Sequence, residues 1–334
     1  MQLPPYRVRL IFLNEFQDSF VKDDTLDPLR LGVSREMEMD NAVELSGVTK
    51  RFGAQTAVER VDLQIPKGCI YGFIGPNGSG KTTTIRMILR IYQPDEGKVA
   101  VLGKTEGSVA DARVGYLPEE RGLYRRMTVR RVLRYFARLK GVSRPDRVID
   151  EHLERMGAQD WGRKRIEQLS KGMAQKIQFI VAVIAKPELI ILDEPFSGLD
   201  PVNMEVLRDA VLELRRQGST VIFSTHDMDM AERMCDRVFM IYRGKKVLDG
   251  TLESIQSGYG TNTLRVRMAN HQSLPDRLDG VARQTITGRF YDLELDGEES
   301  RPRVLSQLLQ IGDVEHFETT RPSLHDIFVK IAKI

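Results

Sequence analysis

Cysteine is scarce in this sequence: its 334 residues include two, Cys69 and Cys235, and no Cys-x-x-Cys pair. Two cysteines cannot build the disulfide framework of a small secreted domain, so a reducing compartment such as the cytosol is expected. An excess of one charge is also lacking, because 50 basic and 47 acidic side chains leave a net charge of +3. The composition therefore does not indicate a positive field for nucleic acid, and we expect no nucleic-acid partner.

Long hydrophobic runs are absent as well. The longest uninterrupted apolar stretch, Phe179–Ala185, has seven residues, whereas a membrane-spanning helix needs about 18. If the protein works at a membrane, we expect it to do so through a partner. What is present is globular composition, with 41% hydrophobic and 29% charged residues, and a length that predicts about two domains.

The patterning along the chain predicts an extension and two domains. Residues 1–40 show weak periodicity, with eight acidic and five basic side chains, and are expected to form a loose N-terminal extension. Residues 41–250 alternate apolar strands with helical stretches, which predicts an α/β domain with a mostly parallel sheet. Within it, residues from about 123 to 168 are predicted to form a helical insert, in which Thr128 can cap a helix.

Residues 251–334 are predicted to form a smaller C-terminal accessory domain of the α+β class. The expected order is β-α-β-β-α-β, the split βαβ or ferredoxin-like arrangement. Its first helix is predicted over Ser273–Leu278 and its second over Pro302–Ile311. A last helix is predicted over Pro322–Ile331.

The run from Gly75 to Thr82 fits G-x-x-x-x-G-K-[ST] and lies between a predicted strand and a predicted helix, the context that a phosphate-binding loop requires. Glycines let backbone N–H groups turn toward phosphate oxygens, and the following helix adds partial positive charge. Lys81 is expected to reach the β- and γ-phosphates, and the Thr82 hydroxyl to bind Mg²⁺. The residues predicted to hold the nucleotide here are Gly75, Pro76, Asn77, Gly78, Ser79, Gly80, Lys81, Thr82 and Thr83.

A second buried strand, Leu189–Leu192, delivers Asp193 and Glu194 at its carboxyl end, where open α/β sheets place their ligands. Asp193 is expected to hold Mg²⁺, and Glu194 can polarise an attacking water as general base. An apolar run that ends in Asp-Glu is by itself equally typical of a strand that meets solvent. The phosphate loop earlier in the chain favours the catalytic interpretation.

Taken together, these motifs resemble the ATP-binding subunit of an ABC transporter over residues 43–250. Leu169–Met173 (LSKGM) stands where that family has its LSGGQ signature, and Ser197–Asp200 matches the family's D-loop. His226 matches the switch histidine, and Phe52 stands where the family carries an aromatic residue that stacks on adenine. The similarity to sodium- and drug-efflux exporters of bacteria and archaea rests on Glu119–Tyr124 and Pro322–Phe328.

The resemblance implies an ATPase with the cofactors ATP and Mg²⁺. It implies a head-to-tail dimer, expected to be of two identical chains, in which Ser170 and Gly172 of one subunit close the ATP site of the other. Asp200, the last residue of the D-loop match, is also expected to bind the nucleotide. Glu194, His226 and Glu119 are the expected catalytic residues, and Thr82, Asp193 and Glu119 the expected metal ligands. The partner implied is a separate transmembrane permease, with the chain peripheral on the cytoplasmic face of the cell membrane.

Two features depart from the family pattern. Lys171 and Met173 replace a glycine and a glutamine of the signature, whereas Ser170 and Gly172 remain. Glu119 replaces the glutamine of the family's Q-loop, which keeps the side-chain length and adds a negative charge.

Other interpretations stay open beside the transport ATPase. A soluble ABC ATPase that acts on ribosomes normally carries two cassettes, and this chain has one phosphate loop. A chromosome-maintenance ATPase inserts long coiled coils, but here only 89 residues separate Lys81 from Ser170. A subunit that binds ATP without cleaving it is expected to lack Glu194 or His226. The ten basic residues and one acid of positions 121–147 fit either a solvated helix face or a patch for anionic lipid headgroups.

Overall fold

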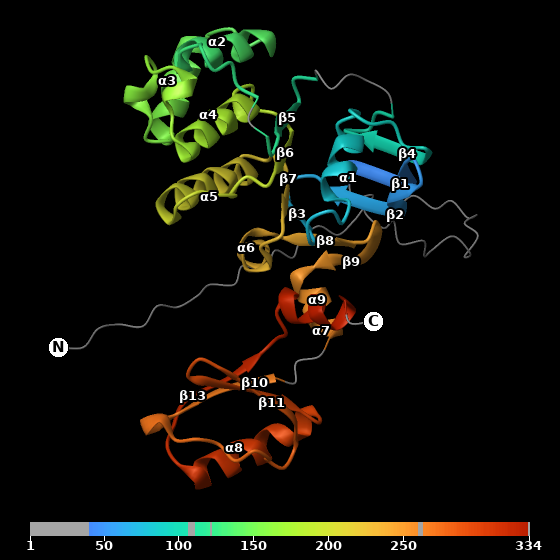
Figure 1. Ribbon diagram of the computed structural model, residues 1–334, viewed down its shortest axis with the longest axis vertical. Coiled ribbons are helices and arrows are strands. Elements are labelled where there is room, and N and C mark those ends of the chain that lie inside the picture. The colour runs from blue at the N-terminus through green and yellow to red at the C-terminus, as the bar shows by residue number, and fades with distance from the viewer. Residues whose placement is uncertain (1–39, 106–110, 121, 260–262, 333–334) are drawn as a thin grey trace, which may run out of the picture. The chain divides into compact units, whose positions relative to one another are not determined.

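The computed structural model describes residues 40–105, 111–120, 122–259 and 263–332 (Figure 1). Apart from Asp40, the expected N-terminal extension lies outside the described residues, as does Arg121 of the basic run. Among the described helices, none is both long and apolar enough to span a membrane.

A six-stranded sheet forms the centre of the larger α/β part. Its order is β5 (Val114–Leu117), β6 (Leu189–Asp193), β7 (Thr220–Thr225), β3 (Ile70–Ile74), β8 (Arg237–Tyr242) and β9 (Lys245–Thr251). All neighbouring pairs are parallel except β8 and β9. The β3, β6 and β7 strands are buried along their whole length, as expected of parallel strands covered on both faces. Their carboxyl ends meet at one edge of the sheet.

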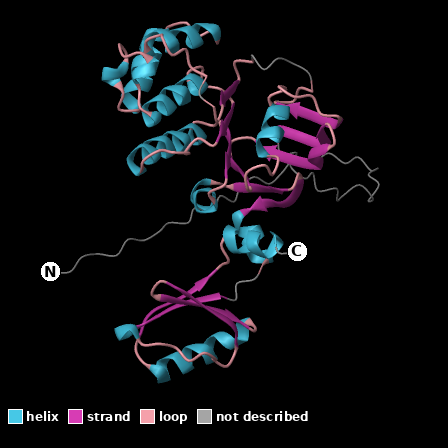
Figure 2. Cartoon of the chain, in the orientation of Figure 1, coloured by secondary structure: helices cyan, strands magenta, loops and turns pink. Residues whose placement is uncertain are grey.

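The two faces of this sheet are covered differently, as Figure 2 shows. On one face, apolar side chains such as Ile74 and Phe223 pack with helices. These helices are α2 (Val129–Leu139), α3 (Pro145–Arg155), α4 (Lys171–Val183), α5 (Pro201–Arg216) and α6 (Met228–Met234). On the other face, Phe73 and Ile222 pack with α1 (Lys81–Ile88) and a three-stranded antiparallel sheet. Its order is β2 (Gln55–Pro66), β1 (Asn41–Phe52) and β4 (Glu96–Val101).

The helical insert begins where the sequence places its cap. The Thr128 side chain accepts a hydrogen bond from the Arg131 N–H, at 3.4 Å, at the start of α2. The buried residues Val129, Val132 and Leu133 follow the helical spacing. Short 3-10 turns, Gln159–Trp161 and Ile166–Gln168, lead on to α4.

The C-terminal part opens with α7 (Leu252–Gly258), followed by a four-stranded antiparallel sheet. The sheet order is β11 (Val281–Thr287), β12 (Phe290–Leu295), β10 (Thr263–Met268) and β13 (Val314–Thr320). After a 3-10 turn at Glu298–Ser300, α8 (Arg301–Ile311) connects β12 to β13 and packs on one face of the sheet. Strand order and crossover are those of the ferredoxin-like arrangement.

The helix predicted over Ser273–Leu278 is wrong. That segment is irregular and follows a 3-10 turn at Ala269–His271. Leu274 and Leu278 are both buried, which explains the helix-like spacing. Pro275 disfavours helical geometry at the residue before it, so the segment packs on the sheet without forming a helix.

The last helix, α9 (Leu324–Ala332), belongs by packing to the core of the larger part. Leu324 and Ile327 are fully buried in the same cluster as Met230 of α6. The Glu232 carboxylate of α6 accepts the backbone N–H of Leu324. The end of the chain therefore completes a hydrophobic core that begins with β3.

Candidate active site

A cleft of about 420 Å³ lies over the loop between β3 and α1. Side chains from four separate segments line it, and most belong to the residues that the sequence predicts. The lining residues are Phe52, Gln55, Ala57, Asn77, Gly78, Ser79, Gly80, Lys81, Thr82, Thr83, Glu119 and Glu194. The fold thus brings the predicted phosphate loop together with the predicted aromatic residue and two predicted acids.

Glycine is required at two positions of the loop. Gly75 and Gly80 have φ angles of +148° and +115°, a backbone region that other residues rarely adopt. A Cβ atom on Gly75 would lie 2.3 Å from the carbonyl oxygen of Ile241 in β8. One on Gly80 would lie 2.6 Å from the carbonyl oxygen of Ala57 in β2. The loop is held tightly between two strands, with its shape fixed before any ligand binds.

Lys81 reaches back over this loop from the first turn of α1. Its Nζ donates to the carbonyl oxygens of Gly75 at 2.7 Å and Pro76 at 3.2 Å. Burial lowers the pKa of this ammonium, and the Glu194 carboxylate, 3.9 Å away, opposes that shift. A phosphate oxygen would give Lys81 a charged partner, which makes a stronger hydrogen bond than a neutral carbonyl.

Asp193, at the end of β6, presents an unpaired oxygen beside the loop. The carboxylate is 1% exposed, and its Oδ1 accepts hydrogen bonds from Thr82 at 3.4 Å and Ser224 at 2.5 Å. Its Oδ2 is buried with no hydrogen-bond partner among the described residues. A buried oxygen without a partner is costly, and a hard cation would satisfy it. The residues therefore fit Mg²⁺ at Asp193 and Thr82.

Glu194 follows Asp193 and meets His226, which comes just after β7. The Nδ1 of His226 lies 3.1 Å from Oε1 and 3.2 Å from Oε2 of Glu194. Burial raises the pKa of the Glu194 carboxyl, and the hydrogen bond with His226 opposes this shift. A carboxylate with a raised pKa accepts a proton more readily than an ordinary glutamate, as a general base should.

Glu119 lies in the cleft wall but apart from Asp193. Its side chain is exposed, and it makes no hydrogen bond with Thr82 or Asp193 among the described contacts. Gln178 of α4 holds the backbone on both sides of it, because its Nε2 donates to the carbonyl oxygens of Pro118 and Glu120, each at 3.2 Å. The loop is anchored while the Glu119 side chain stays free to approach a ligand.

Ser170, Gly172 and Asp200 do not line the cleft of their own chain. Ser170 caps α4 by accepting the Met173 N–H at 3.2 Å, and Asp200 caps α5 by accepting the Asn203 N–H at 3.0 Å. The two helix starts are neighbours, since a Cβ on Gly172 would lie 3.3 Å from Nδ2 of Asn203. The structure thus gathers these residues at a second place on the surface.

Two residues at the site, Ser224 and Gln178, were not predicted from the sequence. Ser224 contacts the carboxylate of Asp193 and the backbone N–H of Glu194, and Gln178 fixes the loop that carries Glu119. The available signal for Gln178 was a polar residue directly before the longest apolar run of the chain, where burial demands a hydrogen-bond partner. Ser224 had the weaker signal of a hydroxyl that ends a buried strand.

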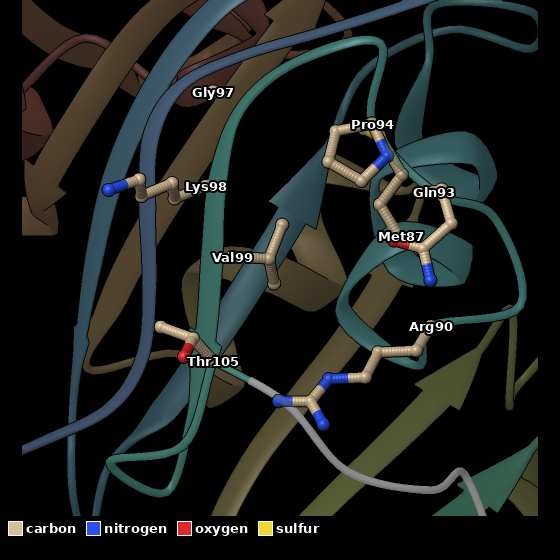
Figure 3. Close-up of a pocket in the computed structure, with 8 residues that line it drawn as sticks. All are labelled: Met87, Arg90, Gln93, Pro94, Gly97, Lys98, Val99 and Thr105. Carbon is tan, nitrogen blue, oxygen red and sulfur yellow. The ribbon is translucent and has the colours of Figure 1, made fainter.

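A second hollow, of about 330 Å³, lies between the end of α1 and β4 (Figure 3). The guanidinium of Arg90 donates to the carbonyl oxygen of Lys104 at 2.6 Å, and Lys98 points away from Arg90 in the close-up. None of its lining residues, all within the described part of the chain, is a carboxylate, histidine or cysteine. The cleft over the β3–α1 loop is therefore the better candidate for catalysis.

Comparison with known proteins places two family models on the chain. The model described as ABC transporter matches residues 58–197. The model described as ATP-binding protein DrrA1-3-like, C-terminal domain, matches residues 250–332.

Individual relatives cover most of the chain. The uncharacterised ABC transporter ATP-binding protein YhaQ of Bacillus subtilis is 41% identical over 285 residues, which are 85% of this chain and 96% of that protein. The daunorubicin resistance ATP-binding protein DrrA3 of Streptomyces coeruleorubidus is 30% identical and covers 87% of this chain and 96% of its own length. A solved structure titled as the ATP binding subunit of an ABC transporter superposes with a TM-score of 0.61 at 30% identity, over 66% of this chain and 93% of its own.

Proposed function

The chain belongs to the ATP-binding subunits of ABC transporters, and from that premise we propose how it holds and hydrolyses ATP and what it drives. It is an ATPase with the α/β fold of this family. The observation that carries the proposal is the meeting of Glu194 and His226, 3.1 Å apart, beside the phosphate loop.

The triphosphate of ATP lies along residues 75–83 in this proposal. Loop N–H groups and the start of α1 face its oxygens, and Lys81 turns from its two carbonyl partners to the β- and γ-phosphates. The adenine stacks on Phe52, whose ring lines the same cleft and is 44% exposed. An aromatic residue exposed to that extent beside a cleft is available to a ligand.

Thr82 and Asp193 would hold Mg²⁺, and we retain Glu119 as a third ligand that moves in when nucleotide binds. The ion, when bound, neutralises charge that develops between the β- and γ-phosphates. This assignment is supported by the buried, unpaired Oδ2 of Asp193.

Hydrolysis then depends on a water held against the γ-phosphate. Glu194 takes the proton of that water as general base, while the His226 imidazole holds the carboxylate in place from its other side. Lys81 stabilises the negative charge of the transferred phosphoryl group.

Two copies of the chain are proposed to form the working ATPase. Ser170, Gly172 and Asp200 lie outside the cleft of their own chain, at the adjoining starts of α4 and α5. We assign them to the cleft of a second, identical copy, where the Ser170 hydroxyl and the Gly172 backbone reach the γ-phosphate. Lys171, which replaces a family glycine, has its side chain against Gly198.

The ATP cycle is proposed to drive a separate transmembrane permease, an exporter, from the cytoplasmic face of the membrane. Support comes from relatives named for daunorubicin resistance and Nod factor export. We keep the division of the chain into the extension 1–40, the ATPase domain 41–250 with its insert at about 123–168, and the accessory domain 251–334, whose last helix, α9, packs into the core of the ATPase domain. The match of a separate family model to residues 250–332 supports its second boundary.

The test is purification in mild detergent from native membranes, with identification of the membrane protein that co-purifies. The Glu194→Gln variant, trapped with ATP, should elute as a dimer that carries a permease. Recovery with ribosomes and without a membrane protein would contradict the transport proposal.

A further inference from the structure

Ser224 occupies a central position in the sheet, next to the strand that delivers the two acids. In the β6–β7 ladder it lies opposite Asp193, and in the β3–β7 ladder opposite Phe73. Its side chain is fully buried. The hydroxyl is therefore sealed from solvent and its direction is set by the partners it finds there.

Both partners belong to the site. The Ser224 Oγ donates to Oδ1 of Asp193 at 2.5 Å and accepts the backbone N–H of Glu194 at 3.0 Å. One hydroxyl thus joins the side chain of the first acid to the backbone of the second. Neither bond is part of the sheet ladder, so both are additional to the backbone pairing of β6 and β7.

The backbone that this hydroxyl holds is unusual. Glu194 has a φ angle of +49°, in the left-handed region that side chains other than glycine rarely adopt. Such a conformation persists only where the surroundings fix it, and it is often found at functional sites. Here it turns the chain directly after β6, and the Glu194 side chain reaches His226.

The same strand end therefore fixes Glu194 at two points. Ser224 holds its backbone N–H, and His226, two residues further on, holds its carboxylate. With both its backbone and its carboxylate held, the Glu194 side chain is restricted to one orientation. A general base needs that, because a small misplacement relative to the water lowers the rate steeply.

We propose that Ser224 is a positioning residue for ATP hydrolysis, which joins Asp193 to the backbone of Glu194 and so sets the direction in which the Glu194 carboxylate faces the cleft. This inference rests on the proposed role of Glu194 as the general base. Ser224 is fully buried and does not line the cleft, so it acts through Glu194.

The Ser224→Ala variant tests it. We expect kcat to fall about 10- to 100-fold, the loss typical of a displaced catalytic group. The KM for ATP and the binding of a fluorescent ATP analogue should stay within about twofold, because a residue that acts only after ATP has bound changes kcat alone. Ser224→Cys keeps the size and a weak S–H donor, so its kcat should lie between those of Ser224→Ala and the wild type.

A matched control lies in the same strand. Thr220 is also buried in β7, and its hydroxyl also accepts one backbone N–H, that of Gly68 at 2.9 Å, at the opposite end of the strand. Thr220→Val should lower the melting temperature about as much as Ser224→Ala and leave kcat unchanged. An equal loss of kcat in both variants would show a general weakening of the strand and overturn the proposal.

The double variant of Ser224→Ala with Glu194→Gln distinguishes the positioning role of Ser224 from the proposed role of Glu194 as general base. If Ser224 acts through Glu194, Ser224→Ala should slow the Glu194→Gln protein no further. A Ser224→Ala protein with near wild-type kcat, beside an inactive Glu194→Gln protein, would overturn the positioning role alone. Near wild-type hydrolysis by Glu194→Gln would instead overturn the assignment of the base.

Discussion

The rings of Phe52 and Tyr92 meet edge to face, with their centroids 5.3 Å apart. Phe52 is thus steadied from one side by Tyr92 while its ring remains exposed beside the phosphate loop. Phe52→Ala should raise the KM for ATP about 2- to 13-fold, which corresponds to the ~0.5–1.5 kcal/mol of an aromatic stack. The free energy of unfolding should fall by only about 1–1.5 kcal/mol, because the Phe52 side chain is half-buried.

Phe73 is the matched control for Phe52, since its ring is fully buried in β3, the strand that precedes the phosphate loop. Phe73→Ala should cost about 3–5 kcal/mol of stability, as buried aromatic truncations do. A large stability loss in Phe52→Ala with an unchanged KM would show that Phe52 is a structural core residue and does not stack on adenine.

Glu194→Gln keeps the shape of the general base and removes its basicity. ATP should still bind and dimers should accumulate, while steady hydrolysis falls at least ~100-fold. Lys81→Ala should instead lose nucleotide binding, because the phosphates lose their charged partner. Size-exclusion chromatography with ATP, beside phosphate release, distinguishes the two variants.

The pH dependence of kcat should report the same carboxylate. Burial raises the Glu194 pKa, so the group takes up a proton at a higher pH than an ordinary glutamate. The base form is lost as the pH falls through that raised pKa, and kcat should fall with it. An acid limb centred at or below the ordinary glutamate pKa would argue against this.

Glu119 carries a negative charge close to where the γ-phosphate is proposed to lie. Glu119→Gln should hydrolyse ATP with a weaker dependence on Mg²⁺ concentration. The Mg²⁺ concentration that gives half-maximal activity should change about two- to fivefold, since one exposed charge is worth under about 1 kcal/mol. Glu119→Ala should uncouple hydrolysis from transport in membranes that contain the permease. Identical Mg²⁺ titrations and transport rates for all three proteins would remove Glu119 from the site.

His152 on α3 offers a test of stability against pH. Burial lowers the pKa of its imidazole from 6.5 to about 4. Between these values the unfolded chain takes up a proton that the folded chain does not. Stability should therefore fall as the pH drops from 6.5 toward 4, by at most about 3 kcal/mol from this group.

His152→Gln should make this decline shallower in urea unfolding at pH 7, 5.5 and 4.5. The same substitution at His325, which is exposed at the surface of α9, should leave the slope as it is. Equal slopes for wild type and His152→Gln would show that other groups govern the acid range.

The sequence predicted the parts of the fold that depend on strong local patterns. Buried strands such as β6 and the loop from Gly75 to Thr82 are contiguous, and their chemistry follows from residue type. The β4, β8 and β9 strands were not predicted from the sequence. The β4 and β9 strands carry several charged or glycine residues, whereas β8 is largely apolar and its place in the sheet depends on pairing with the distant β3. The helix predicted at Ser273–Leu278 was wrong because the prediction relied on the spacing of the apolar residues and ignored Pro275, which disfavours helical geometry at the preceding residue.

Within the site, the sequence could name residues but not their contacts. The link from Ser224 to Asp193 and Glu194 depends on β6 and β7 lying side by side, which neither segment specifies alone. The assignment of Ser170, Gly172 and Asp200 to a second copy stays a prediction. So do the roles of Glu119 and His226.

The packing of α9 makes the larger hydrophobic core discontinuous along the chain. A polypeptide that stops after α7 would leave the sites of Leu324 and Ile327 on α6 open to water, and α6 starts just beyond His226. Synthesis therefore cannot complete this core until α9 has been translated and has left the ribosome. The four-stranded sheet lies in the sequence between two segments that contribute to the same core. A single protease cut within this sheet would therefore leave two fragments that still associate through α9.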